Sequence, residues 1–371
     1  MSNLLKSWSD IKNMENSVPY YTMRSSSDDS AEVSEVEGGY YYLSVEDGKI
    51  LPVIYDAETV FSYDTAFVQP VRFAEEGLKG VTGRKQCFAN KVPCGFTPVK
   101  RSLSSGESFT FHTMVGFSQT TDQINDKLKK ITAAGFFEEK EQLAAECCEA
   151  LTKDVRTVTG VPVFDSYVEY SYMDNFLRGG YPFVFGKGDK KSVVHLFSRK
   201  HGDPERDYNF FSINGEYYSQ GNGNFRDVNQ NRRNDLLFHK EVGDFNIKTF
   251  YQLLQIDGYN PLEVRPSTFQ IKEEEEAAAE GFLKKASPRE WKVLLDAAKN
   301  PFTPGKIAGI LARNSLELTI SEDDFLTELL SFCTQNIEAG FGEGYWSDHW
   351  DYNMDLIENY LSIFPDKEQE L

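Results

Sequence analysis

Cysteine and histidine are scarce in this chain. Its 371 residues include five cysteines and five histidines. The odd number of cysteines, with no C-x-x-C pair, indicates neither a disulfide framework nor a zinc knuckle, and reduced thiols are the simplest interpretation. His195 and His201, taken together with Asp203, match no metal-ligand spacing. We therefore expect no bound metal.

Long hydrophobic runs and an excess of positive charge are also missing. The first residues lack the apolar core of a secretory signal, and no apolar run approaches the length of a membrane-spanning helix. The 39 lysines and arginines are outnumbered by 58 aspartates and glutamates, which gives a formal charge of −19. Such a charge repels the phosphates of nucleic acids and anionic lipids. We expect a cytoplasmic protein that binds neither nucleic acid nor membrane.

Two glycine-rich stretches are incomplete as nucleotide-binding motifs. Gly221 and Gly223 are followed by Arg226, where a dinucleotide fingerprint requires a third small residue. Residues 185–188 lack the first glycine and the Ser/Thr of a phosphate loop. Neither stretch implies a nucleotide cofactor.

Apolar residues are abundant, at 40% of the chain, and 14% are aromatic, which excludes a disordered protein. Short runs of β-branched and aromatic residues separated by turns predict strands at residues 39–45, 50–55, 59–63 and 65–68. Residues 104–115 alternate polar and apolar side chains around Phe109 and Phe111, as a strand with one solvated face does. These patterns predict an antiparallel β domain.

The apolar spacing becomes helical at Asp122. Residues 122–134 and 137–151 have the pattern of a helical hairpin, and residues 164–177 predict a buried helix. Most of the chain beyond residue 235 is also predicted to be helical, with capping sequences at Ser287 and Ser321. The chain is therefore expected to be an α+β multidomain protein.

A polar segment at residues 217–235 combines glycines, asparagines and arginines. Its pattern predicts a tight loop and then a helix that starts at Asp227, with Gln230 completing a capping box. Asp227, Gln230, Asn231 and Asn234 would share one helix face. Short carboxylate and amide groups suit the vicinal hydroxyls of a sugar. A capping box in an asparagine-rich surface turn explains the residues equally well.

A second polar segment lies at residues 340–352. Its glycines permit a close turn before a helix capped by Ser347 or Asp348, whose buried stripe would be Trp350, Met354, Ile357 and Leu361. Trp346, Asp348 and His349 would stand at the mouth of this helix. An aromatic ring beside a carboxylate suits a carbohydrate pocket. A capped helix with a pair of core tryptophans is the alternative.

The two polar segments resemble one known family. Residues 224–230 resemble the R-D-x-x-Q segment of the cellobiose-phosphorylase-like inverting phosphorylases, and residues 342–350 resemble the family's later glycine, acid and tryptophan segment. The resemblance implies a β-sandwich portion at residues 1–118, a helical linker at 119–155 and the first part of an (α/α)6 catalytic barrel at 156–371. Residues 197–204 look more like the long-chain β-glucan phosphorylases of this family.

The resemblance also implies roles for individual residues. Arg226 and Asp227 would hold the hydroxyls of the sugar in the −1 subsite, and Gln230 would support them. Trp346, Asp348 and His349 would lie near the rim of the pocket. The family usually has an acid after the glutamine, whereas this chain has Asn231, which leaves the sugar preference open.

The implied reaction is the splitting of a β-glucan or cello-oligosaccharide by inorganic phosphate, with inversion and without an organic cofactor. One protein carboxyl suffices as general acid. The family's general acid is expected beyond Leu371, so this chain would be an incomplete, inactive portion, unless Asp348 is itself the acid. The partner would be an oligosaccharide, and a homodimer of the complete protein remains an option.

Two other functions are compatible with the same residues. A non-catalytic carbohydrate-binding or assembly protein could retain the sugar-recognition face, and an inverting glycoside hydrolase could use water on the same barrel. Phosphate-dependent release of a sugar 1-phosphate would distinguish phosphorolysis from hydrolysis, and binding without turnover would indicate the non-catalytic protein.

Overall fold

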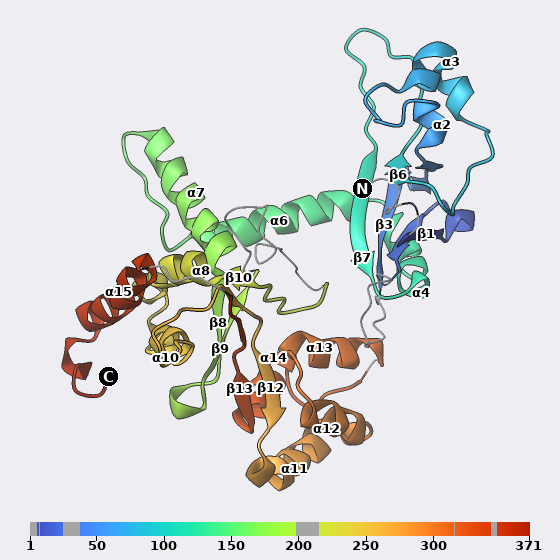
Figure 1. The fold of residues 1–371 in the computed structure, drawn as a ribbon. Helices are drawn as coiled ribbons and strands as arrows, with labels where there is room; N and C mark the ends of the chain where they lie inside the picture. The colour runs from blue at the N-terminus through green and yellow to red at the C-terminus, as the bar shows by residue number, and fades with distance from the viewer. Residues whose placement is uncertain (1–5, 7, 25–37, 198–214, 315, 343–346) are drawn as a thin grey trace. The chain divides into compact units, whose positions relative to one another are not determined.

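A computed structural model describes residues 6, 8–24, 38–197, 215–314, 316–342 and 347–371. The chain divides into two compact units, residues 1–148 and 149–371, and the boundary lies within helix α6 (Phe136–Thr152). Both units combine helices with antiparallel sheets (Figure 1), as the α+β prediction stated. Among the described residues, none of the helices has the length and apolar character that a membrane span requires.

The first unit is built on a five-stranded antiparallel sheet. Its strands are β1 (Ser9–Lys12), β2 (Tyr20–Met23), β3 (Gly39–Glu46) and β4 (Lys49–Ile50) in that order, with β7 (His112–Ser118) paired to β3. Leu43 and Val45 of β3 pack with apolar residues of the short helices α4 (Thr121–Asn125) and α5 (Leu128–Ile131). The strand predicted at residues 39–45 is therefore confirmed.

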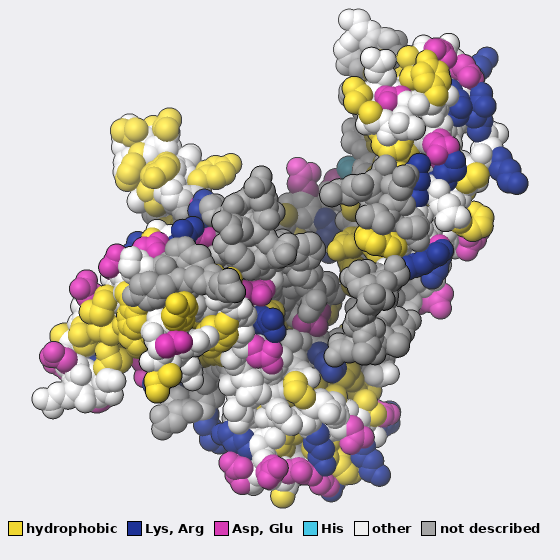
Figure 2. All heavy atoms as spheres, viewed as in Figure 1, with side chains coloured by type: hydrophobic (Ala, Val, Ile, Leu, Met, Phe, Trp, Pro, Cys, Tyr) yellow, Lys and Arg dark blue, Asp and Glu magenta, His cyan; other side chains and the backbone are white. Residues whose placement is uncertain are grey.

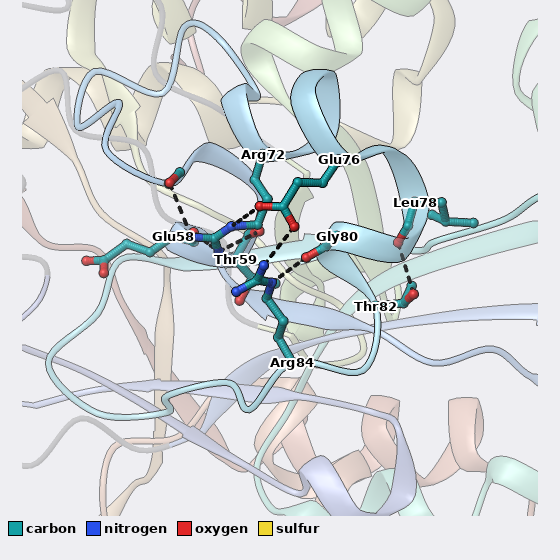
Figure 3. A network of polar contacts seen from close by, with 9 residues as sticks. Glu58, Thr59, Arg72, Glu76, Leu78, Gly80, Thr82 and Arg84 are labelled. Atoms are coloured by element: carbon teal, nitrogen blue, oxygen red, sulfur yellow. Dashed lines mark hydrogen bonds and ion pairs between the residues drawn. The ribbon is translucent and has the colours of Figure 1, made fainter.

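The strand predicted at residues 59–63 is wrong, because residues 59–61 belong to helix α2 (Glu58–Phe61) and residues 62 and 63 form a turn. Helix α3 (Val71–Val81) follows. Arg72 of α3 donates from Nη1 to the carbonyl oxygens of Glu58 and Thr59, at 3.0 and 3.1 Å (Figure 3). Because a helix leaves its last carbonyls without partners inside the helix, this arginine stabilises the C-terminal end of α2. The local sequence does not predict this contact. Arg84 pairs with Glu76 at 2.7 Å beside it.

Two more strand predictions in this unit are wrong. Residues 65–68 form turns, and the strand expected over residues 104–115 begins only at His112. Phe109 and Phe111 stay exposed and stack on each other, with ring centroids 6.1 Å apart. The remaining strands, β5 (Ile54–Asp56) and β6 (Pro93–Phe96), form a separate two-stranded sheet.

The second unit has nine helices among its described residues. After α7 (Pro162–Gly179) they are α8 (Phe225–Arg232), α9 (Asp235–Phe238), α10 (Phe245–Gln252), α11 (Glu276–Ala286), α12 (Trp291–Lys299), α13 (Pro304–Arg313), α14 (Glu322–Ser331) and α15 (Asp348–Ile363). Its antiparallel strands are the hairpin β8 (Tyr181–Phe185) and β9 (Ser192–Leu196), the pair β12 (Thr268–Ile271) and β13 (Cys333–Asn336), and the trio β10 (Gly223–Asn224), β11 (Glu263–Val264) and β14 (Ala339–Gly340). The prediction of helix alone in the last third is thus incomplete.

Two apolar clusters form the core of the second unit. One is shared by α11–α14 and the β12–β13 pair and contains the fully buried Phe269, Leu283 and Phe325. The other joins α8, α10 and α15 around the fully buried Phe225 and Phe250. The cap predicted at Ser321 is confirmed, since its side chain accepts from the Asp324 N–H, whereas the helix expected from the Ser287 cap starts at Trp291.

Helix α7 is only half buried, in contrast to the prediction. Tyr172 and Phe176 are buried near its C-terminal end, but Val163, Tyr167 and Tyr170 are 80%, 65% and 78% exposed. Apolar side chains gather at the N-terminal end of α7 in the space-filling view (Figure 2). The helix packs against α8, and the contact is close at Gly179, where an added Cβ would lie 2.9 Å from that of Asn231.

Candidate functional site

Helix α8 carries the first predicted motif, but it begins two residues before the predicted start. Its N-cap is Asn224, whose side-chain oxygen accepts from the Arg226 N–H at 3.1 Å. Asparagine caps as well as aspartate does, and the earlier cap lets Phe225 enter the core. Asp227 therefore lies in the first turn, where its charge favours the positive end of the helix dipole.

The predicted face of carboxylate and amides does not form as a unit. Asn231 donates from Nδ2 to the backbone carbonyl of Asp227 at 2.6 Å, so its amide serves the helix itself. Asn234 lies beyond the end of α8 and is the N-cap of α9. Gln230 is half-buried and has no hydrogen-bond partner among the residues that the structure describes.

Asp227 is buried, with 6% of its surface exposed, and its Oδ1 atom lies 3.3 Å from Nε of Arg226. The Arg226 side chain retains 43% exposure. The aspartate can therefore orient the arginine from beneath, while the guanidinium remains accessible to a ligand.

Helix α15 carries the second predicted motif. It begins at Asp348, and its N-cap Ser347 makes no side-chain cap hydrogen bond. The buried face consists of His349, Asn353, Leu356 and Tyr360. The predicted stripe of Trp350, Met354, Ile357 and Leu361 is confirmed only in part. Ile357 and Leu361 are half-buried and pack against the core. The buried face is nevertheless rotated by one residue from the prediction, and Met354 is 49% exposed.

Polar contacts between α8 and α15 explain this rotation. Asn229 donates from Nδ2 to Oδ1 of Asn353 at 2.5 Å, with both side chains fully buried. Arg233 pairs with Asp355, and Asn359 donates to the Arg233 carbonyl at 2.8 Å. Buried amides need hydrogen-bond partners, so these contacts turn the polar positions of α15 toward α8.

The contact between the helices brings four predicted residues together. The His349 ring lies over Phe225, with centroids 5.5 Å apart. Burial lowers the pKa of His349, the charge of Asp348 opposes that shift, and the charge of Arg226 adds to it. We call Arg226, Asp227, Asp348 and His349 the α8–α15 cluster. Trp346 lies outside the described residues.

A second buried group of polar side chains was missed by the sequence patterns. His195 of β9 lies with its Nε2 atom 2.8 Å from Oδ2 of Asp235, and Asn246 of α10 donates to the same oxygen at 2.8 Å. Burial, with a contribution from the Arg232 charge, lowers the pKa of His195 to about 4. His195 is therefore neutral, and its Nε2–H donates to the carboxylate.

Arg232 lies beside this pair and is also buried. Its Nε atom donates to the carbonyl of Gly179 at 2.6 Å. Burial lowers its pKa to about 10, although the Asp235 charge acts in the opposite direction. The residues of this group come from four elements or their ends, so no local spacing could have identified it.

Metal binding finds no support in the geometry. Within the described ranges, no three histidines, cysteines or acids come together as a metal site would require. Of the three residues considered for this role from the sequence, His201 and Asp203 lie outside the described residues, and His195 is committed to Asp235.

Comparison with protein-family models and with curated proteins found no match to this chain.

Proposed function

We propose that this chain is part of an inverting glycoside phosphorylase that splits a β-glucan or cello-oligosaccharide with inorganic phosphate. The observation that carries the proposal is the α8–α15 cluster. Its two segments are more than 100 positions apart in the sequence, and each resembles a different segment of the same family. Their meeting in space is what a shared substrate pocket requires.

The exposure of each residue indicates whether it would contact the sugar or position a residue that does. Arg226 is accessible and has spare N–H donors for sugar hydroxyls, while the buried Asp227 holds its guanidinium in position. Asp348 is half-buried at the first turn of α15 and can reach a ligand. His349, which is 4% exposed, lies against Phe225 and would support the proposed sugar site from the core.

The proposed architecture follows the same family. The antiparallel sheet of the first unit would be a β-sandwich portion, and the helices of the second unit would be the beginning of an (α/α)6 barrel. The predominance of helices in the second unit supports this assignment. In the reaction, phosphate attacks the anomeric carbon while a carboxylic acid protonates the leaving oxygen.

The test is oligoglucan binding by the purified chain, measured by calorimetry. Arg226→Ala should weaken binding by about 10- to 100-fold, because a charge-assisted hydrogen bond contributes about 1.5–3 kcal/mol. Asp227→Asn should weaken it less, since the arginine remains but loses its orienting charge. Asp296→Ala, which removes an exposed charge on α12, is the control and should have no effect.

Incubation with phosphate separates the alternatives. Release of a sugar 1-phosphate supports phosphorolysis, and release of free sugar without a phosphate requirement indicates a hydrolase. Binding without either product indicates a non-catalytic carbohydrate-binding protein. If Arg226→Ala binds oligoglucans as tightly as the unaltered chain does, the assignment of the α8–α15 cluster as the sugar site is wrong.

A further inference from the structure

A small cavity in the second unit is lined by two arginines, by neutral polar groups and by four apolar residues. His195, Arg232 and Thr249 form part of its wall, together with Arg265 and Ser267. Among the described residues, neither an aspartate nor a glutamate lines it. A cavity with two arginines and no acid is unusual for a chain that carries a formal charge of −19, and it favours an anionic ligand.

Two buried side chains at this cavity have unused hydrogen-bonding capacity. Arg232 is 8% exposed and uses only Nε, which donates to the Gly179 carbonyl. Its terminal nitrogens make no hydrogen bond with any described residue, which leaves up to four N–H donors. Thr249 is 2% exposed, and its hydroxyl has no partner within the described ranges. Such groups are costly to bury unless something binds them.

Asp235, whose charge acts on Arg232, already interacts with two other side chains. Oδ2 of Asp235 interacts with both His195 and Asn246, at 2.8 Å each. Arg265 is 52% exposed, and its closest acidic oxygens are 3.8 and 3.9 Å away, on Glu338 and Glu263. Both arginines can therefore bind an additional anion without losing a close ion pair.

The size of the cavity limits what it can hold. The enclosed space is about 10 Å³, which is room for about one water molecule. It adjoins a wider cleft of about 250 Å³ that shares Gln220, Gly221 and Arg265 with it. An oxyanion could place one oxygen in the cavity and the rest of the group in the cleft.

We propose that the cavity lined by Arg232, Thr249 and Arg265 binds an oxyanion, most suitably a phosphate group. The phosphate can be free or carried by a sugar, because the adjoining cleft is wider than the cavity and polar side chains line it, including Glu216, Asn222, Glu263 and Thr303, which are of the types that bind hydroxyl groups. Because inorganic phosphate is the co-substrate of the proposed function, this proposal rests on that function for the choice of anion and names a site for it, although binding at this place requires neither a glucan nor turnover.

The experiment is calorimetric titration of the full chain with inorganic phosphate, sulfate and glucose 1-phosphate, at constant ionic strength and without glucan. Thr249→Val removes an unpaired hydroxyl at nearly constant volume, so the fold should survive and the affinity should fall about fivefold or more. Arg265→Gln should have a similar effect.

Matched controls exclude general effects of charge or hydroxyl loss. Arg289→Gln removes an exposed arginine outside the cavity, and Thr334→Val removes an exposed threonine hydroxyl on β13. Both should bind like the unaltered chain. Tighter binding of glucose 1-phosphate than of phosphate would identify a sugar phosphate as the ligand, and equal binding would identify the free anion.

Two results would overturn the proposal. One is the absence of saturable binding by all three anions, which would mean that the cavity holds only water. The other is binding that Thr249→Val and Arg265→Gln leave unchanged, which would place the anion elsewhere. Neither result bears on oligoglucan binding at the α8–α15 cluster, so the two proposals can fail separately.

Discussion

Mild acid should destabilise the second unit through His195. The ring is 5% exposed and donates to Asp235. Burial lowers its pKa from 6.5 to about 4 in the folded chain. The unfolded chain therefore binds a proton at His195 more readily than the folded chain does. The resulting stability is fully present above about pH 6.5 and is lost as the pH falls towards about 4.

The size of this effect follows from the two pKa values. Between pH 7.5 and pH 5, the unfolded state gains the free energy of protonating His195, while the folded state remains almost entirely unprotonated. With pKa values of 6.5 and about 4, linkage gives a loss of about 2 kcal/mol. Such a loss is a large fraction of the stability of a typical domain.

The assay is urea unfolding at several pH values between 7.5 and 5, followed by tryptophan fluorescence. Three of the four tryptophans, at positions 291, 346 and 350, belong to the second unit. Replacing Trp8 of the first unit by phenylalanine in all variants makes the signal report on the second unit. The key variant is His195→Gln, whose amide can donate to Asp235 but cannot take up a proton. It should lose about 2 kcal/mol less than the unaltered chain over this range. His112→Gln, in the other unit, should keep the full pH dependence.

One outcome would refute this prediction. If the unaltered chain and His195→Gln lose the same free energy between pH 7.5 and pH 5, then His195 is not a buried neutral histidine in solution. The interaction with Asp235 would then hold the ring in its charged form, and the reasoning from burial would be refuted.

Three further predictions concern stability and can be checked by the same unfolding measurement. Asn224→Ala should cost about 1 kcal/mol by removing the N-cap of α8, whereas Asn224→Ser should retain most of the stability. Asn353→Leu should cost about 1–3 kcal/mol because it removes the acceptor of the buried Asn229 amide, and adding Asn229→Leu should recover part of that loss. Leu283→Ala, at a fully buried position of α11, should cost about 2–5 kcal/mol, and a smaller effect would show that the core around α11–α14 is loosely packed.

Local sequence patterns predicted the helices, strands and caps that depend mainly on residues close in the chain. The β3 strand and helix α6 follow from apolar periodicity, and the cap at Ser321 follows from its neighbours in the chain. The same patterns failed where a distant residue decides the conformation. Residues 58–61 form a helix whose end is held by Arg72, and α15 is turned by the contact of Asn353 with Asn229, 124 positions away.

The resemblance of two sequence segments to one family indicated six site residues, which are Arg226, Asp227, Gln230, Trp346, Asp348 and His349. Only the tertiary structure decided that Asp227 and His349 are buried while Arg226 is accessible. It also brought His195 to Asp235 and left Arg232 beside a cavity without acids. Burial and pairing across 40 to 120 residues depend on how the helices and strands pack, and no short stretch of sequence contains that information.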